Sequence, residues 1–287
     1  MNPTYRPYAP ARLLLALLLV GSFAYLGMLI AATVHEVVGH GLATLLVGGQ
    51  FLGFQLDLDG MGHAWTPLPQ HAGRWHQVVV FLGGVTATTA VGSLLLATAY
   101  AARKKPVVAL PALALALNLL LEGSPYLFWN ALHPVLPGDV AVVVAIYPLP
   151  WVRTLLMAMG GGIMIASIMC GAALLLWMIE GWVGNGQPLT GRWRIIALVL
   201  LGALSGAAWF LFDWNQLAPG LDSWPNVVGL SLHLAAALSL FWIRIAPEPL
   251  AFSRRATAYA VAVGWAMVAT AVAVTVFWLR PGWVWGA

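Results

Sequence analysis

Residues 13–40 read LLLALLLVGSFAYLGMLIAATVHEVVGH, an apolar run that ends in two histidines and a glutamate. The part from Leu13 to Val34 is long enough to cross the hydrocarbon core of a bilayer, about 30 Å, as one helix. It is too long for the apolar region of a signal peptide, and no Ala-x-Ala cleavage site follows it, so we expect a retained membrane helix. The stretch predicts a membrane protein whose first helix carries ionisable side chains into or near the bilayer.

The composition of the whole chain supports a membrane protein. Of the 287 residues, 61% are hydrophobic and 8% are charged, which is too little charge to cover a soluble domain of this size. The formal net charge is +4, but the basic residues are scattered between apolar runs, so we expect no nucleic-acid partner. The single cysteine, Cys170, lies in an apolar run, so any metal must be held by nitrogen and oxygen ligands.

Seven apolar stretches are long enough to be transmembrane helices. They are Leu13–Val34, Gln77–Ala102, Val107–Trp129, Leu155–Ile179, Ile195–Phe212, Val227–Ile243 and Thr257–Leu279. A shorter apolar piece, Val140–Trp151, contains Pro148 and Pro150, and we expect it to be re-entrant or interfacial. The fold class we predict is therefore an all-α polytopic membrane protein with about seven transmembrane helices.

The distribution of Lys and Arg predicts the orientation in a cell membrane, either the plasma membrane or an inner membrane. One side of the predicted topology has ten basic residues and the other side has three. The ten are Arg6, Arg12, Arg103, Lys104, Lys105, Arg192, Arg194, Arg244, Arg254 and Arg255, and the three are Arg74, Arg153 and Arg280. Because loops rich in Lys and Arg stay in the cytoplasm, we expect a cytoplasmic N-terminus and a C-terminus outside.

The loop between the first two spans, residues 48–76, differs in composition from the rest of the chain. Apolar and polar residues alternate towards Leu58, and Asp59-Gly60 follows before the run Met61–Thr66. An Asp-Gly pair between two such runs is typical of a hairpin turn. We expect a small β-hairpin in this first outer loop, at the membrane surface.

His35, Glu36 and His40 are the candidates for chemistry, because buried ionisable groups near hydrocarbon are expensive. They resemble the His-Glu-x-x-His zinc signature, but the second histidine is five residues after the first. An ideal α-helix would place the two rings roughly 140° apart. In the interpretation we prefer, a π-bulge returns His40 to the face of His35, and Gly39 supplies the backbone freedom. In the alternative, Glu36 and His40 are the ligands and His35 supports them.

A simpler interpretation is that these polar groups satisfy one another at a helix end near the headgroups. Three such groups within six residues, in a chain with 7 His and 9 acidic residues, weigh against it.

The order of motifs along residues 13–150 resembles the site-2 protease family of intramembrane zinc peptidases. That family has a His-Glu helix, a small membrane-associated sheet, a span that opens with Gly-Pro-x-x-Asn, and an Asn-x-x-Pro stretch before Leu-Asp-Gly. The counterparts here are Gly-Val-Thr-Ala-Thr at residues 84–88, Asn130 with Pro134, and Asp139 after Gly138.

The resemblance implies roles for individual residues. His35, His40 and Asp139 would hold Zn²⁺, and Glu36 would be the general base. Asn130 and Thr88 would help to position a substrate strand.

The resemblance also implies a domain organisation and a function. A metal-binding core would cover residues 1–153, with the first three spans, the hairpin at 48–76 and a loop at 130–152. Residues 154–287, whose four predicted spans have no counterpart in the resemblance, would form a four-helix transmembrane part of unknown role. The protein would be a membrane-embedded zinc metalloprotease that hydrolyses a peptide bond in or near the bilayer, with a membrane protein or peptide as its substrate.

Two further side chains are candidates for the same site. Glu122, near the outer end of the third span, is a candidate fourth metal ligand or proton relay, and it is equally compatible with a helix-end carboxylate that reaches water. His133 could replace Asp139 as a ligand, although a His-Pro pair in a loop is more typical of a surface residue.

Two other classes of function stay open. A metalloprotease-like scaffold that has lost catalysis could serve as a subunit or metal-binding partner of a homo- or hetero-oligomeric membrane assembly. The shifted histidine and the replaced Gly-Pro-x-x-Asn stretch favour this alternative. A redox or transport protein ranks last, because the chain lacks repeated histidine boxes and the repeat pairing of many secondary transporters.

Overall fold

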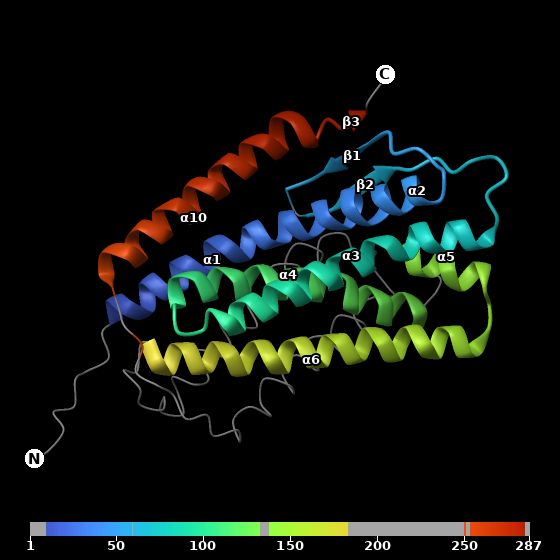
Figure 1. The fold of residues 1–287 in the computed structure, drawn as a ribbon. Coiled ribbons are helices and arrows are strands. Elements are labelled where there is room, and N and C mark those ends of the chain that lie inside the picture. Colours follow the sequence, from blue (N-terminus) through green and yellow to red (C-terminus); the bar gives the residue numbers. More distant parts are fainter. Residues whose placement is uncertain (1–9, 59, 133–137, 183–249, 251–252, 285–287) are drawn as a thin grey trace, which may run out of the picture.

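A computed structural model describes residues 10–58, 60–132, 138–182, 250 and 253–284, which form a helical bundle with one small sheet (Figure 1). The elements are α1 (Pro10–Thr33), η1 (Val34–Gly41), α2 (Leu42–Leu46), β1 (Gly53–Leu56), β2 (Gly62–Trp65), α3 (Arg74–Ala101), α4 (Pro106–Leu132), α5 (Asp139–Ile146), α6 (Pro150–Trp182), α10 (Arg254–Val274), η4 (Thr275–Leu279) and β3 (Trp283–Val284). The elements η1 and η4 are π-helices within longer continuous helices.

Five helical stretches of the described chain are long and apolar enough to cross a membrane. They are Leu14–Leu46, Arg74–Ala101, Pro106–Leu132, Pro150–Trp182 and Arg255–Leu279. These stretches correspond to the first four and the last of the predicted spans. The predicted spans Ile195–Phe212 and Val227–Ile243 lie outside the described residues, so the number seven stays a prediction. The segment Val140–Trp151 is divided between α5 and the start of α6, and its re-entrant character also stays a prediction.

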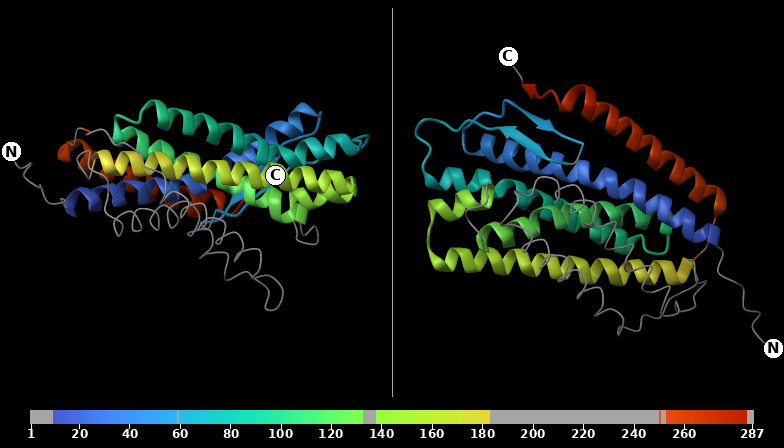
Figure 2. Two further views of the ribbon diagram at one scale, coloured as in Figure 1. Left: turned by 90° about the horizontal axis from the view of Figure 1, so that it is seen from below. Right: turned by 180° about the vertical axis from the view of Figure 1, so that it is seen from behind.

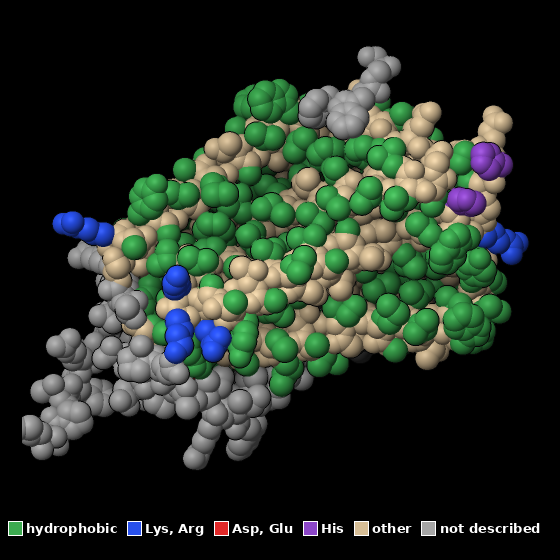
Figure 3. Space-filling model, in the orientation of Figure 1, with side chains coloured by type: hydrophobic (Ala, Val, Ile, Leu, Met, Phe, Trp, Pro, Cys, Tyr) green, Lys and Arg blue, Asp and Glu red, His purple; other side chains and the backbone are tan. Residues whose placement is uncertain are grey.

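Helix α4 occupies the middle of the described bundle and packs against α1, α3 and α6. Small and apolar side chains at their contacts, such as Ala116, Leu117 and Ala172, are buried. Helix α10 lies along the outer side of α1 (Figures 1 and 2). Hydrophobic side chains cover the middle of the face in Figure 3, while Lys and Arg gather at its two ends. This distribution is the one expected for helices that cross a bilayer.

The predicted hairpin is present. Strands β1 and β2 pair antiparallel, with Phe54 opposite Ala64. The turn contains Gly60 at φ +82°, a left-handed backbone conformation that glycine adopts without strain. The sequence did not predict the third strand: β3, far along the chain, pairs with the other edge of β1 and gives the order β2-β1-β3.

The sheet lies alongside the first span, and its place at the membrane surface stays a prediction. Leu56 packs in a buried cluster with Met28 and Leu29 of α1. Near the turn, the Tyr25 hydroxyl donates a hydrogen bond to the Leu58 carbonyl at 3.1 Å. The apolar face of β1 is buried against α1, and Leu279 of η4 packs against the same cluster. Burial of this apolar face explains why the hairpin reaches so far along α1.

Candidate metal centre

The π-helix η1 covers the sequence VHEVVGHG. In a π-helix the hydrogen bonds run between residues five apart, so side chains with this spacing share a face. His35 and His40 have this spacing, and their ring centroids lie 4.8 Å apart. The π-helical conformation expected from the histidine spacing is therefore confirmed.

Glycines let η1 approach α3 closely enough to place the histidines between helices. A Cβ on Gly39 would lie 2.3 Å from the Cα of Gly84, and a Cβ on Gly83 would lie 2.6 Å from the Gly39 carbonyl oxygen. Only glycine permits such an approach of two backbones. One consequence is that His40 reaches α3, where its Nδ1 is 2.7 Å from the Val80 carbonyl oxygen.

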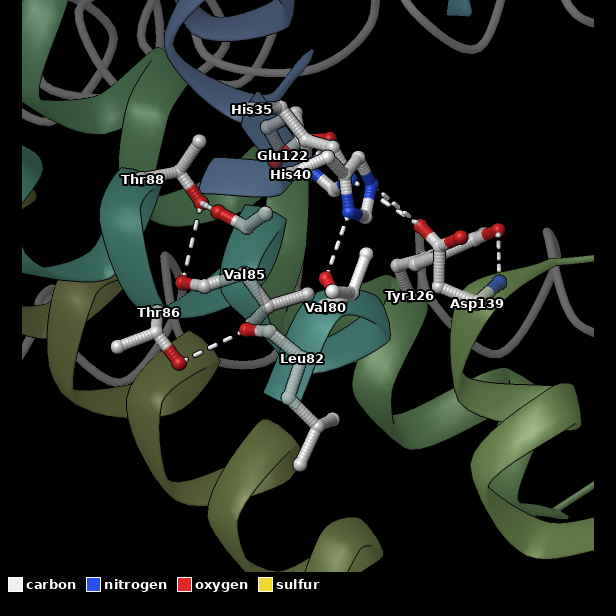
Figure 4. A network of polar contacts seen from close by, with 11 residues as sticks. His35, His40, Val80, Leu82, Val85, Thr86, Thr88, Glu122, Tyr126 and Asp139 are labelled. Carbon is white, nitrogen blue, oxygen red and sulfur yellow. Dashed lines mark hydrogen bonds and ion pairs between the residues drawn. The ribbon is translucent and has the colours of Figure 1, made fainter. Parts of the chain in front are cut away.

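Asp139, the first residue of α5, completes a cluster with the two histidines (Figure 4). Its Oδ2 is 3.3 Å from Nε2 of His35 and 3.0 Å from Nε2 of His40. The three ligand atoms lie within 4.8 Å of one another, and the described residues contain no other such cluster of three His, Cys or acidic groups. The sequence separations of 104 and 99 residues show that the fold creates this cluster.

The donor set fits a zinc ion. Zinc bonds of about 2.0–2.2 Å in tetrahedral geometry place neighbouring ligand atoms about 3.4 Å apart, close to the two observed distances from Asp139. The Nδ1 atoms face the acceptors Glu122 and Val80, so the Nε2 atoms present lone pairs to a carboxylate when the rings are neutral. The lone pairs of the two Nε2 atoms and the Asp139 carboxylate repel one another unless a positive charge lies between them. A metal ion can supply this charge, and so can protons bound to the rings.

The surroundings of Asp139 favour its ionised form. Burial alone would raise the pKa of its carboxyl group, but when Nε2 of each ring carries a proton, hydrogen bonds from His35 and His40 hold that pKa below its usual value. Asp139 is therefore a carboxylate at neutral pH, which is the form that binds a metal.

Glu36 lies between the cluster and the sheet. Its side chain is half-buried against β2, where a Cβ on Gly62 would lie 2.7 Å from Glu36 Cγ and 3.1 Å from Oε1. The Glu36 carboxylate accepts no hydrogen bond from the described residues, so its oxygens are not occupied by them. The carboxylate is therefore available as a proton acceptor beside the edge of the sheet.

The other candidate residues take different positions. Glu122 is close to the cluster, with Oε1 2.8 Å from His35 Nδ1. Asn130 is buried at the end of α4, and its Oδ1 has no hydrogen-bond partner among the described residues. Thr88 is buried, with its hydroxyl 3.2 Å from each of two carbonyl oxygens of its own helix, so its role in substrate binding stays a prediction. His133 lies outside the described residues.

Two side chains near the cluster were not predicted. The Tyr126 hydroxyl accepts a hydrogen bond from the Asp139 backbone N–H at 3.0 Å, and Arg153 donates to the carbonyl oxygens of Ala131 and Leu132 at the end of α4. A signal for Tyr126 exists in the sequence. Polar side chains recur every four residues on α4, and these are Asn118, Glu122, Tyr126 and Asn130. That spacing marks one face of a helix.

The described residues thus define an integral membrane protein with a cluster that can hold a metal ion. The sequence model of the Peptidase M50B-like family matches residues 8–174. Because this match covers more than half of the chain, the protein belongs to the site-2 protease-like M50 family of membrane metallopeptidases. No curated protein and no solved structure is significantly similar to the chain.

Proposed function

We propose that the protein is a zinc-dependent endopeptidase that hydrolyses a peptide bond in or near the bilayer. The observation that carries the proposal is the convergence of His35, His40 and Asp139, with Glu36 next to His35 in the same π-helix. Family membership supports the same chemistry. We propose His35, His40 and Asp139 as the zinc ligands and Glu36 as the general base.

Zinc held by these residues would supply a Lewis acid that polarises the scissile carbonyl and lowers the pKa of a water molecule. The residues of the chain would transfer the proton and hold the ligand atoms in place. Glu36 accepts the proton of the attacking water and returns it to the leaving amide nitrogen. The two histidines keep Nε2 aimed at the cluster because Nδ1 faces Glu122 in one ring and the Val80 carbonyl in the other.

The substrate must be extended at the cleaved bond, because a helix already uses its carbonyl groups in hydrogen bonds. We propose that it adds as a strand to the free edge of β2. The other edge of the hairpin pairs with β3, whereas Gly62 of β2 lies against Glu36. The Asp57 N–H donates to the Met61 carbonyl. Because hydrogen-bonding groups alternate along a strand, Gly62 directs its own N–H and C=O to the free edge.

We also propose an orientation in the membrane and a role for the N-terminal part of the chain. The excess of Lys and Arg on one side supports a cytoplasmic N-terminus and a C-terminus outside, with the metal centre towards the outer face. The core at residues 1–153 would carry the chemistry. We assign no role to residues 154–287, and assembly into oligomers stays a prediction.

The alternative of a scaffold without catalysis is not favoured. It depended partly on the five-residue histidine spacing, and the π-helix places both rings on one face in spite of that spacing.

The experiment that tests the proposal compares wild type with Glu36→Gln after purification in detergent. Zinc content is measured by elemental analysis, and cleavage is measured with labelled casein and with single-span peptides in lipid nanodiscs. We expect about one zinc per chain in both proteins and cleavage by wild type alone. Equal cleavage by Glu36→Gln would contradict the assigned base, and wild type without zinc would contradict the metal centre.

A further inference from the structure

The three proposed ligands come from two elements that are far apart in the sequence and that both pack against α3. His35 and His40 belong to η1, whereas Asp139 begins the eight-residue helix α5. In the described part of the chain, Asp139 meets the two histidines through its Oδ2 and their Nε2 atoms, and a bound metal would replace these contacts. Other groups must therefore hold Asp139 and His35 at the correct separation.

We infer that α4 positions this metal centre through two residues one helical turn apart, Glu122 and Tyr126. The inference rests on the proposed zinc site. It assigns Glu122 to the orientation of His35 and Tyr126 to the placement of Asp139. Neither residue is a metal ligand or a reacting group in this assignment.

Glu122 sets the orientation of His35. Its Oε1 lies 2.8 Å from His35 Nδ1, and its side chain is only 11% exposed. A carboxylate at this nitrogen favours the tautomer with the proton on Nδ1, which leaves the Nε2 lone pair for the metal. The opposite side of the ring is closed by α3, because a Cβ on Gly84 would lie 2.2 Å from Nε2. His35 is therefore fixed between α4 and α3.

Tyr126 sets the position of Asp139 through the backbone. Its hydroxyl oxygen accepts the Asp139 N–H at 3.0 Å. The preceding residue, Gly138, has φ +151°, and a Cβ there would overlap the Tyr126 hydroxyl and would lie 2.6 Å from Asn130 Oδ1. Any other residue at position 138 would push α5 away from α4. The close packing of Gly138 against the Tyr126 hydroxyl thus determines the position of the Asp139 backbone, from which its side chain extends.

One rigid helix carries both contacts. Residues four apart lie on the same helix face, so Glu122 and Tyr126 present a fixed spacing towards the cluster. Helix α4 packs against α1, α3 and α6, and close packing restricts its movement. The contacts with α4 therefore help to set the separation of His35 from Asp139 before a metal binds, together with α3, against which η1 and α5 both pack. A separation fixed in advance reduces the ordering needed on binding.

The test uses Glu122→Gln and Tyr126→Phe, each purified as the full chain in detergent. Ser124→Ala is the matched control, because Ser124 is also buried on α4 but, within the part of the chain that the structure describes, its hydroxyl bonds only to the Leu120 carbonyl. Zinc affinity is measured by competition with a chromogenic chelator, and the coordination geometry by the absorption spectrum of the cobalt-substituted protein. Thermal unfolding without metal reports on the fold.

We expect each variant to bind zinc about 10–100-fold more weakly than wild type and to show an altered cobalt spectrum. The unfolding temperature of the metal-free variants should stay close to that of the control. Zinc affinity and cobalt spectra equal to wild type in both variants would overturn the inference. The inference would also be overturned if a variant lost zinc only in proportion to a loss of folded protein.

Failure of this inference is distinguishable from failure of the proposed function. Wild type that binds no zinc would overturn both. Wild type that binds zinc and cleaves peptides, with variants of unchanged affinity, would overturn only the role of α4.

Discussion

The imidazole of His35 occupies the space into which any residue other than glycine would place its Cβ at position 84. A Cβ there would lie 2.2 Å from His35 Nε2 and 2.4 Å from Cδ2. Both atoms belong to a rigid ring that is held on its other side by Glu122. The ring has no room to move away, so the two helices must separate if position 84 gains a side chain.

Gly84→Ala should therefore weaken zinc binding and destabilise the protein. Overpacking a close contact costs about 1–3 kcal/mol, and displacement of Nε2 removes a ligand from its position. Zinc content and thermal unfolding in detergent measure the two effects.

Gly162→Ala on α6 is the control for that substitution. A Cβ there would meet none of the described residues within 4 Å, and Ala replaces Gly in a helix with a gain of about 0.5–1 kcal/mol. We expect normal zinc content and unchanged or higher stability. If Gly84→Ala behaved like this control, the close contact would not determine the position of His35.

A second prediction concerns the end of α4. Arg153 donates from Nε to the Ala131 carbonyl at 3.0 Å and from Nη2 to the Leu132 carbonyl at 2.8 Å. A cation at the last carbonyl groups of a helix also interacts favourably with the helix dipole. Arg153→Met keeps the apolar stem and removes both donors, so we expect a loss of about 1–3 kcal/mol in the free energy of unfolding.

Thermal unfolding measures the effect of Arg153→Met against Thr154→Ala. Thr154 is exposed and, among the described residues, its hydroxyl bonds only to the Pro150 carbonyl of α6 itself, so its loss should change little. Equal unfolding temperatures for the two variants would show that Arg153 does not stabilise this junction.

The parts of the site that could be predicted from the sequence are those encoded locally. The apolar run ending at His35 predicted the first span, and the five-residue spacing to His40 predicted a π-helix, because few other conformations bring the two rings together. The hairpin followed from Asp59-Gly60 between two alternating runs. Each of these features depends on neighbours in the sequence, where helix and strand periodicity apply.

The features that were missed depend on distant contacts. The pairing of β3 with β1 joins segments more than two hundred residues apart, and no local pattern in Trp283-Val284 indicates it. The packing of the hairpin along α1 depends on the contact of Leu56 with Met28, which no loop composition reveals. The contact between Tyr126 and Asp139 was accessible only through the polar spacing on α4, which predicts a face but not its partner.

The third prediction tests whether the π-helix exists to align the histidines. Deleting Val38 changes His-Glu-Val-Val-Gly-His to His-Glu-Val-Gly-His, in which an ordinary α-helix places both rings on one face. Val38 is 44% exposed and is not part of the cluster. A π-bulge accommodates one extra residue, so its removal should leave α1 and α2 in register. We expect the deletion variant to keep about one zinc per chain and a stability close to that of wild type.

Insertion of one alanine after Val38 is the opposite change. It separates the histidines by six residues, which neither an α-helix nor a π-helix places on one face, so we expect zinc to be lost while the helical content by circular dichroism is kept. Elemental analysis measures the zinc content per chain of both variants. If the deletion variant were folded but lost zinc, the π-helix would do more than align His35 with His40, and its wider backbone would itself be needed to bring Gly39 against Gly84.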